Sequence, residues 1–172
     1  ILLKFCLSHN IPYFILGKGS NLLISDKGIK GIVISTECFN KITLGRYYLS
    51  AFCGVTLKDL GNFACENGLS GLEFASGIPG SVGGAVFMNA GAYGNEIKDV
   101  LYSSRAILPT QEKLNSPNPV FYLKASEHNF SYRHSVFQDL GLIHLSSLFI
   151  LKKDKPENIR QRMQELQQKR QD

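Results

Sequence analysis

The sequence GLEFASGIPGSVGGAVFMNAGAYG, residues 71–94, holds seven of the 16 glycines in this 172-residue chain. Gly77, Gly80 and Gly83 recur at a spacing of three, and Pro79 fixes one backbone angle between them. Such a backbone can bend tightly and expose its N–H groups. Because apolar residues, rather than the Ser, Asn, Asp and Lys typical of loops, separate these glycines, the pattern predicts a buried segment whose backbone faces a ligand. A glycine-rich surface loop is the alternative.

A second glycine-bearing turn, residues 17–21, follows a predicted buried strand over 13–16. Its free N–H groups, with a serine hydroxyl and an asparagine amide, could hold a pyrophosphate. Neither common nucleotide motif is present, because Lys18 is followed by Gly19 and Leu22 stands where G-x-G-x-x-G requires glycine. The residues leave open a plain turn between two strands, the second restarting at Leu22.

A third stretch, FSYRHSVF, covers residues 130–137. If it is extended, Arg133, Ser135 and Phe137 share one face. A guanidinium beside an aromatic ring can meet an anion at the edge of a covered site. A surface arginine paired with a neighbouring acid is the alternative.

Composition limits the class of protein. The chain is 44% hydrophobic, enough for one core or two small lobes sharing a cleft. No apolar run reaches the roughly 18 to 20 residues of a membrane span, and the opening lacks the basic region of a signal peptide. Because the sequence starts at Ile1, we expect an incomplete N-terminus.

Cysteine and charge patterns exclude further classes. The cysteines form no C-x-x-C pair and the histidines are scattered, which predicts buried free thiols and no metal site. The net charge is +5, but Lys and Arg alternate with acids and Gln near the C-terminus, as on a solvated helix. We therefore expect no nucleic-acid partner.

Periodicity predicts the remaining elements. Thr56 is placed as the N-cap of a helix over 57–67, and Gly68 as its stop. Other helices are predicted at 2–9 and 157–169, and further strands at 31–34, 47–53, 120–124 and 142–151.

Three blocks together resemble the bacterial UDP-N-acetylenolpyruvoylglucosamine reductase (MurB) family. They are LGKGSNLLISD at 16–26, GLEFASGIPGSVGGAVFMNAGAYGNEIKDV at 71–100 and YRHSVF at 132–137. Their order and spacing match, and the resemblance covers essentially the whole chain. It implies an α+β fold, a two-lobed FAD-binding domain of the vanillyl-alcohol-oxidase (PCMH) type. Residues 1–45 would form the first lobe, 46–151 the second, and 152–172 a helix leading to a substrate domain outside the chain.

The resemblance also implies site residues. It assigns the turn at 17–21 to the FAD pyrophosphate, deciding between the two interpretations above. Tyr132 and Arg133 would bind substrate, and Arg133 would be the catalytic group that stabilises enolate charge. No residue is assigned to a metal. The cofactor-binding residues implied are Gly17, Lys18, Gly19, Ser20, Asn21, Leu22, Gly77, Ile78, Pro79, Gly80, Ser81, Gly83, Gly84, Ala85, Asn89, Ala90, Gly91 and Ala92.

The implied reaction is the FAD-dependent reduction of UDP-N-acetylglucosamine enolpyruvate to UDP-N-acetylmuramate with NADPH, in cytoplasmic peptidoglycan precursor synthesis. The family's proton-donor serine lies after the final helix, so the chain is expected to be an incomplete enzyme. No histidine lies in the glycine blocks, which favours non-covalent flavin. Another flavin oxidoreductase of this fold and a non-catalytic FAD-binding module are the alternatives, and the oligomeric state stays open.

Overall fold

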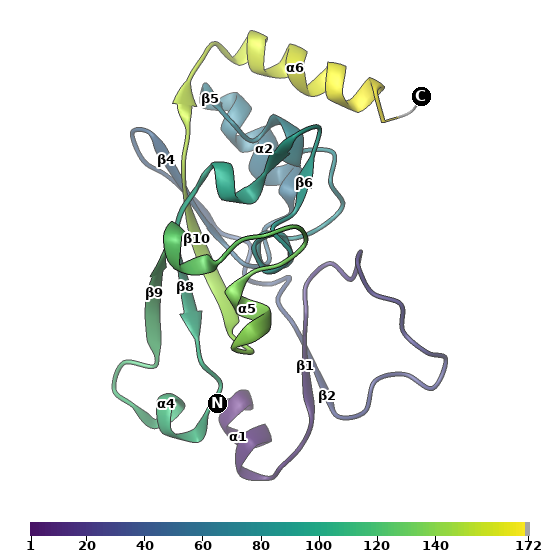
Figure 1. Ribbon diagram of the computed structural model, residues 1–172, viewed down its shortest axis with the longest axis vertical. Helices are drawn as coiled ribbons and strands as arrows, with labels where there is room; N and C mark the ends of the chain where they lie inside the picture. Colours follow the sequence, from purple (N-terminus) through teal and green to yellow (C-terminus); the bar gives the residue numbers. More distant parts are fainter. Residues whose placement is uncertain (171–172) are drawn as a thin grey trace.

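The computed structural model describes residues 1–170; the last two residues of the predicted C-terminal segment lie outside the described part. A five-stranded antiparallel sheet forms the centre, in the order β3-β4-β10-β8-β9 (Figure 1). Its strands are β3 (Ile42–Leu44), β4 (Tyr48–Phe52), β8 (Leu101–Ile107), β9 (Val120–Lys124) and β10 (Ile143–Ile150).

Strand β10 is central because its side chains are buried on both faces, where Phe149 is fully buried. Two short helices, α3 (Val82–Phe87) and α5 (Val136–Asp139), lie beside it. Their buried apolar residues join the main core, which also contains Leu49 and Phe137. The middle of the glycine-rich segment is thus buried, as predicted, but it is a core helix, where the sequence predicted a tightly bent backbone that faces a ligand.

Helix α2 (Leu57–Glu66) begins and ends as predicted. The Thr56 side chain accepts a hydrogen bond from the Asp59 N–H, and Gly68 takes a left-handed φ of 64° after the helix. Helix α6 (Pro156–Gln168) packs against α2 and against the 3₁₀ helix η1 (Glu73–Ala75). Both helices therefore support the start of the glycine-rich segment.

The remaining elements are short. Strands β5 (Leu69–Ser70) and β11 (Lys152–Lys153) pair with each other, and β6 (Gly91–Ala92) forms a hairpin with β7 (Asn95–Glu96). Single turns of helix lie at η2 (Ile97–Asp99), α4 (Gln111–Asn115) and η3 (Ala125–His128).

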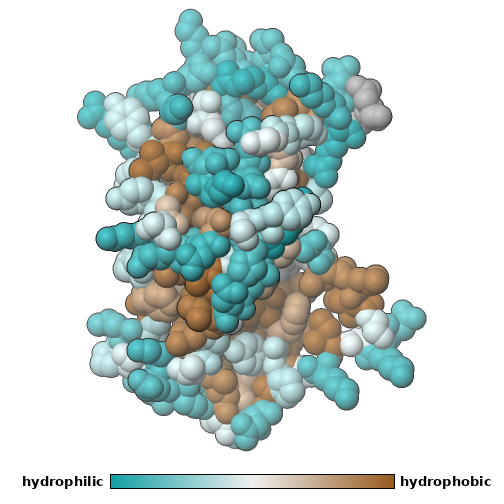
Figure 2. All heavy atoms as spheres, in the orientation of Figure 1, coloured by the Kyte–Doolittle hydropathy of each residue, from teal (hydrophilic) through white to brown (hydrophobic). Residues whose placement is uncertain are grey.

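A separate two-stranded parallel sheet lies near the N-terminus. It pairs β1 (Tyr13–Leu16) with β2 (Ile32–Ser35), after helix α1 (Leu2–Ser8). The predicted strand restarting at Leu22 is wrong: residues 17–31 contain no helix or strand and project as a loop. Within residues 1–170 no strand pairs with this loop, and the side chains of Leu22, Leu23 and Ile24 are exposed, Leu23 completely (Figure 2).

Two further sequence expectations can be compared with the structure. Cys6, Cys53 and Cys65 are buried and free, as predicted, but Cys38 is exposed because it lies in the loop after β2. Among the described residues, no helix has the length and apolar character needed to cross a membrane.

Candidate functional site

The turn at 17–21 and the glycine-rich segment are in contact, although about sixty residues separate them in sequence. The Ser20 hydroxyl donates to the carbonyl of Pro79 at 2.5 Å. A Cβ added at Gly17 would lie 2.5 Å from the Ser81 Oγ, so this close approach requires glycine. The structure therefore brings together two blocks that sequence reasoning assigned to one cofactor.

The backbone of the turn offers unpaired donors. Within residues 1–170, no protein group accepts the N–H groups of Lys18, Gly19, Ser20 or Asn21, and all four residues are exposed. Gly19 has a φ of 73°, which helps consecutive N–H groups to face outward. Oriented backbone N–H groups without a protein partner suit a pyrophosphate, so the turn fits the FAD role implied for it.

The middle of the glycine-rich segment differs from this turn. The Gly83 N–H donates to the Cys53 carbonyl at 2.8 Å, and the Gly84 N–H to the Ser81 hydroxyl at 3.4 Å. A Cβ at Gly83 would lie 3.0 Å from the Cys53 Cβ. Gly83 thus permits close packing of α3 on the end of β4, and its N–H is not free for a ligand.

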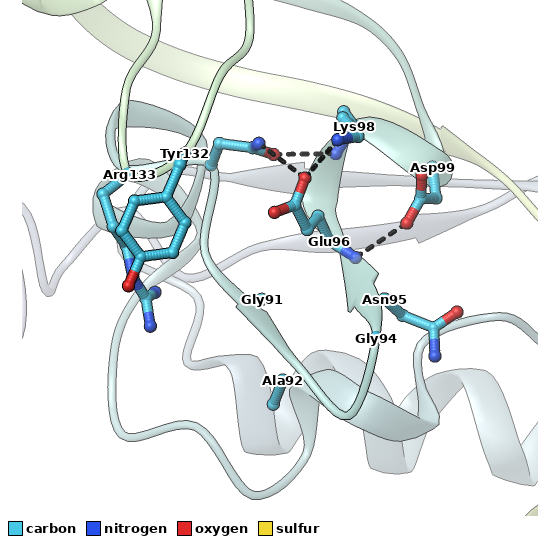
Figure 3. Close-up of a pocket in the computed structure, with 10 residues that line it drawn as sticks. Gly91, Ala92, Gly94, Asn95, Glu96, Lys98, Asp99, Tyr132 and Arg133 are labelled. Atoms are coloured by element: carbon cyan, nitrogen blue, oxygen red, sulfur yellow. Dashed lines mark hydrogen bonds and ion pairs between the residues drawn. The ribbon is translucent and has the colours of Figure 1, made fainter.

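A cavity of about 410 Å³ is lined by residues between 89 and 99 and by the turn at 131–134 (Figure 3). It contains Tyr132 and Arg133 from the third sequence block together with residues that follow the glycines. Sequence reasoning had named five of the residues that line it, and missed the others. The lining residues are Asn89, Gly91, Ala92, Gly94, Asn95, Glu96, Lys98, Asp99, Tyr132 and Arg133.

The missed residues had a signal in the sequence. They lie in GNEIKD, where charged residues follow the glycine block directly, within the second block of the resemblance. The Lys98 ammonium lies 2.5 Å from the Glu96 carboxylate. That contact lowers the pKa of Glu96, and the nearby Arg133 charge adds to the effect. Glu96 is therefore an ionised residue in the cavity wall, and Lys98 compensates its charge.

The predicted extended conformation of 130–137 is wrong. Ser131 and His134 exchange backbone hydrogen bonds of 3.2 and 3.3 Å, closing a tight turn over Tyr132 and Arg133. Arg133 has a left-handed φ of 55°. Ser135 is buried, and its hydroxyl donates to the Phe87 carbonyl at 2.7 Å. Arg133 and Ser135 consequently do not share an open face.

The Arg133 guanidinium has no carboxylate partner within salt-bridge distance among residues 1–170. The guanidinium lies over the Tyr132 ring instead, with the ring centroid 5.7 Å from the guanidinium carbon. The alternative of an arginine paired with a neighbouring acid is therefore not what the described residues show. An exposed, unpaired guanidinium at the cavity wall can receive an anion.

Asn89 connects the parts of this site. Its side-chain amide donates to Glu96 Oε2 and to the Ser131 carbonyl, each at 3.0 Å, and its Oδ1 accepts from the Lys98 N–H at 3.1 Å. The residue is 1% exposed. These bonds tie the glycine-rich segment to the charged wall and to the turn of Arg133. The side chain is thus committed to protein partners, and the Asn89 N–H also donates to the Val86 carbonyl, at 3.3 Å.

A second cavity, of about 290 Å³, lies next to the first turn and includes Lys18. Sequence reasoning did not find its other lining residues, which come from two separated stretches, 37–42 and 54–59, with no shared motif. They are Glu37, Asn40, Ile42, Gly54, Val55, Thr56 and Asp59.

Comparison with known families places this geometry. The FAD binding domain family matches residues 1–115, about two thirds of the chain. The chain belongs to this family. The match agrees with the FAD cofactor expected from the two glycine blocks, and with the free donors of the first turn.

Individual relatives are more specific. The chain is 46% identical over 167 residues to UDP-N-acetylenolpyruvoylglucosamine reductase of Syntrophomonas wolfei, covering 96% of this chain and 54% of that protein. It is 43% identical to the protein of the same name from Clostridium kluyveri, covering 97% and 53%. The 172-residue chain therefore spans about half the length of these relatives.

Solved structures agree. The MurB crystal structure from Thermus caldophilus superposes with a TM-score of 0.80 at 34% identity, covering 98% of this chain and 59% of that one. p-Cresol methylhydroxylase superposes with a TM-score of 0.57 at 16% identity, a likeness of fold alone. The predicted α+β fold of the PCMH type is thereby confirmed.

Proposed function

We propose that this chain is the FAD-binding part of a UDP-N-acetylenolpyruvoylglucosamine reductase. The protein would reduce UDP-N-acetylglucosamine enolpyruvate to UDP-N-acetylmuramate with NADPH, in cytoplasmic peptidoglycan precursor synthesis. One observation carries the proposal beyond the family: the unpaired guanidinium of Arg133 lies in a cavity that the glycine-rich segment also lines. The relatives at 43% and 46% identity carry this enzyme's name.

The residues of the first turn would hold the cofactor without a covalent bond. The N–H groups of residues 18–21 would bind the pyrophosphate, and the backbone of 77–80 would lie along the flavin, where side chains would collide with a planar ring. Bound there, FAD would carry hydride between NADPH and the enolpyruvyl double bond. The protein's part is to bind, orient and exclude water.

Arg133 would act on the substrate. Reduction of an enolpyruvyl ether places enolate charge next to a carboxylate, and a fixed guanidinium stabilises such charge without reorganisation. The neighbouring Tyr132 ring, with 82% of its surface exposed, would contact the same substrate from the turn. Asn89 would hold this turn against the wall through its bond to the Ser131 carbonyl.

The proton donor is a separate question. Ser135 is the serine nearest to Arg133 in sequence on the C-terminal side, but its hydroxyl is buried and donates to the Phe87 carbonyl. It therefore cannot reach an exposed substrate without losing that bond. The proposal assigns the proton donor to a residue outside these 172.

An anaerobic experiment tests the proposal. Protein loaded with FAD is mixed with NADPH and then with UDP-N-acetylglucosamine enolpyruvate, while flavin absorbance is followed. The 172-residue chain should be bleached by NADPH and stay bleached, because a missing general acid costs about 10² to 10⁴ in rate. The protein at its full gene-encoded length should recover its colour on adding substrate. If the full-length protein binds no FAD, or if substrate never restores the colour, the proposal fails.

A further inference from the structure

A line of buried polar side chains crosses strands β8 and β10 and ends on η3. His144 Nε2 lies 2.7 Å from the Ser147 hydroxyl, which lies 2.7 Å from the Ser104 hydroxyl. Ser104 lies 2.9 Å from His128 Nε2, and His128 Nδ1 lies 2.8 Å from the Lys124 carbonyl. The four side chains are between 0 and 7% exposed. Two histidines and two serines thus form one unbranched chain of contacts.

The Lys124 carbonyl fixes the direction of every bond in this chain. A carbonyl oxygen can only accept, so His128 must carry its proton on Nδ1. In the neutral ring Nε2 is then an acceptor, so Ser104 donates to it and must itself accept from Ser147. Ser147 has then used its only proton, so it accepts from His144 Nε2–H. The two histidines are consequently opposite tautomers.

An independent observation agrees with this direction. His144 Nδ1 is buried and has no hydrogen-bond partner among residues 1–170. A bare nitrogen is the expected state of that atom in the Nε2–H tautomer. The opposite tautomer would bury an N–H group with nothing to accept it, which costs more than leaving a lone pair unused.

This line of hydrogen-bonded side chains contacts the residues on either side of the turn that carries Arg133. Phe130, just before the turn, stacks on the His128 ring with centroids 4.9 Å apart. Phe137, just after it, is fully buried, with ring centroids 5.8 Å from His128 and 5.5 Å from His144. Both ends of the turn therefore rest on the two imidazole rings.

We propose that His144, Ser147, Ser104 and His128 form a directional hydrogen-bond relay whose fixed rings position the turn of Tyr132 and Arg133. The four are positioning residues, since none of them lines the cavity. Their effect on catalysis rests on the proposed function, because it acts through Arg133. The relay itself and its hold on the turn do not depend on that function.

Histidine NMR tests the relay directly. In the protein at its full gene-encoded length, labelled with ¹⁵N, two-bond ¹H–¹⁵N spectra distinguish the tautomers, and His128→Gln and His144→Gln variants identify the signals of the two rings by their loss. His128 should be Nδ1–H and His144 Nε2–H. Finding both rings as the same tautomer would overturn the relay.

A serine pair on one strand provides the matched variants. Ser104→Ala removes the middle of the relay, whereas Ser103→Ala changes the neighbouring residue, for which no side-chain hydrogen bond is recorded within residues 1–170. In Ser104→Ala, Ser147 is free to donate to His144, so His144 should become a mixture of tautomers although it does not bond to residue 104. His128 should stay Nδ1–H because the Lys124 carbonyl is unchanged.

The same variants test the positioning of the turn. Amide hydrogen exchange at Ser131 and His134 should become about tenfold faster in Ser104→Ala, because its buried partners are left unpaired, and should not change in Ser103→Ala. Substrate-driven recovery of flavin absorbance should slow about tenfold, with FAD content unchanged. Unchanged exchange in Ser104→Ala would overturn the positioning role. Wild-type protein that never acts on the enolpyruvate would overturn only the proposed function.

Discussion

The two turns proposed to bind FAD and substrate, at 17–21 and 131–134, are built in opposite ways. The turn at 17–21 leaves four N–H groups without a partner in the described part of the chain, and it lies in the connection over 17–31, which has no helix or strand. The turn at 131–134 is closed by its own backbone bonds and held from outside by Asn89, Gln138 and the relay beneath it. A turn that binds through its backbone must leave donors unused, whereas a turn that presents one side chain must fix its own backbone.

Arg133→Ala should have the largest effect if this comparison is right. Losing one preorganised charge donor typically costs about a hundredfold in rate. In the protein at its full gene-encoded length, substrate-driven recovery of flavin absorbance should fall by about that factor, while FAD content and bleaching by NADPH persist. Arg46→Ala is the matched control, since Arg46 also lies over a tyrosine ring, 5.3 Å from its centroid, but outside both cavities. Loss of flavin from Arg133→Ala would instead make Arg133 a cofactor ligand.

Asn89→Ala should break the outside support of the same turn. The change leaves the Ser131 carbonyl and the Lys98 N–H without their side-chain partner in a partly buried place, which costs about 2 kcal/mol of unfolding free energy. Asn95→Ala is the control, because that exposed side chain makes a single bond, of 3.3 Å, to Tyr93. Urea unfolding measures the free energy of unfolding of both variants. Equal stability of the two variants would show that the hydrogen bonds of Asn89 do not stabilise this site.

Sequence reasoning predicted the first turn better than the second. Free N–H groups and positive φ values are local properties, and the glycines at 17–21 predict them. The turn at 131–134 depends on distant partners such as Phe87 and Asn89, and its left-handed residue is an arginine, which no propensity rule favours. Alternation therefore suggested a strand there.

Other elements divide along the same line. Thr56 and Gly68 mark α2 because caps are local, and residues 142–151 indicate β10 because apolar residues dominate this buried strand. The cavity wall of Glu96 and Lys98 was missed because a charge pair at a spacing of two has no local signature. Gly83, predicted to face a ligand, is a packing glycine because β4 comes against it, which its neighbours in sequence do not reveal.

Gly19→Val tests the open turn. Its Cβ would meet only Leu16 Cδ1, at 3.8 Å, so the protein itself has room for it, but a β-branched residue disfavours the φ of 73° that presents the N–H groups. FAD should bind about tenfold more weakly by fluorescence titration, a loss of the order of one hydrogen bond to a charged group. Gly28→Val is the control: Gly28 has the same φ of 73° in the same connection, and nothing lies within 4 Å of its added Cβ. If both variants weaken FAD binding equally, backbone strain in the loop explains the loss and the turn is not the phosphate site.

The smallest effect concerns the base of the glycine-rich segment, which α6 braces. Glu73 is 8% exposed and accepts from Gly71 N–H at 2.6 Å and from two nitrogens of Arg162, at 2.8 and 3.0 Å. Burial alone would raise the pKa of Glu73, but the hydrogen bonds, that of Arg162 first, outweigh it and lower the pKa below 4.5. Asp154 also accepts a hydrogen bond from the Arg162 guanidinium, which lowers the pKa of Asp154.

The sign of the pH dependence follows from these lowered values. Because both carboxyls have a lower pKa when folded than unfolded, their stabilisation is complete above about pH 4.5 and is lost as the pH falls through the folded values.

Arg162→Ala should cost about 1 kcal/mol at pH 7, a modest amount because its side chain is 41% exposed and solvent screens the pair. As the pH falls through the lowered pKa of folded Glu73 the cost should shrink, since protonated Glu73 no longer needs the guanidinium. Arg160→Ala, an exposed change on the same helix, should show neither effect, and urea unfolding of both variants from pH 3 to 7 measures the difference. A cost for Arg162→Ala that stays constant over this range would mean that α6 is held by its apolar packing, with the buried Ile159. The ion pairs of Arg162 would then add nothing to the stability of the base of the glycine-rich segment.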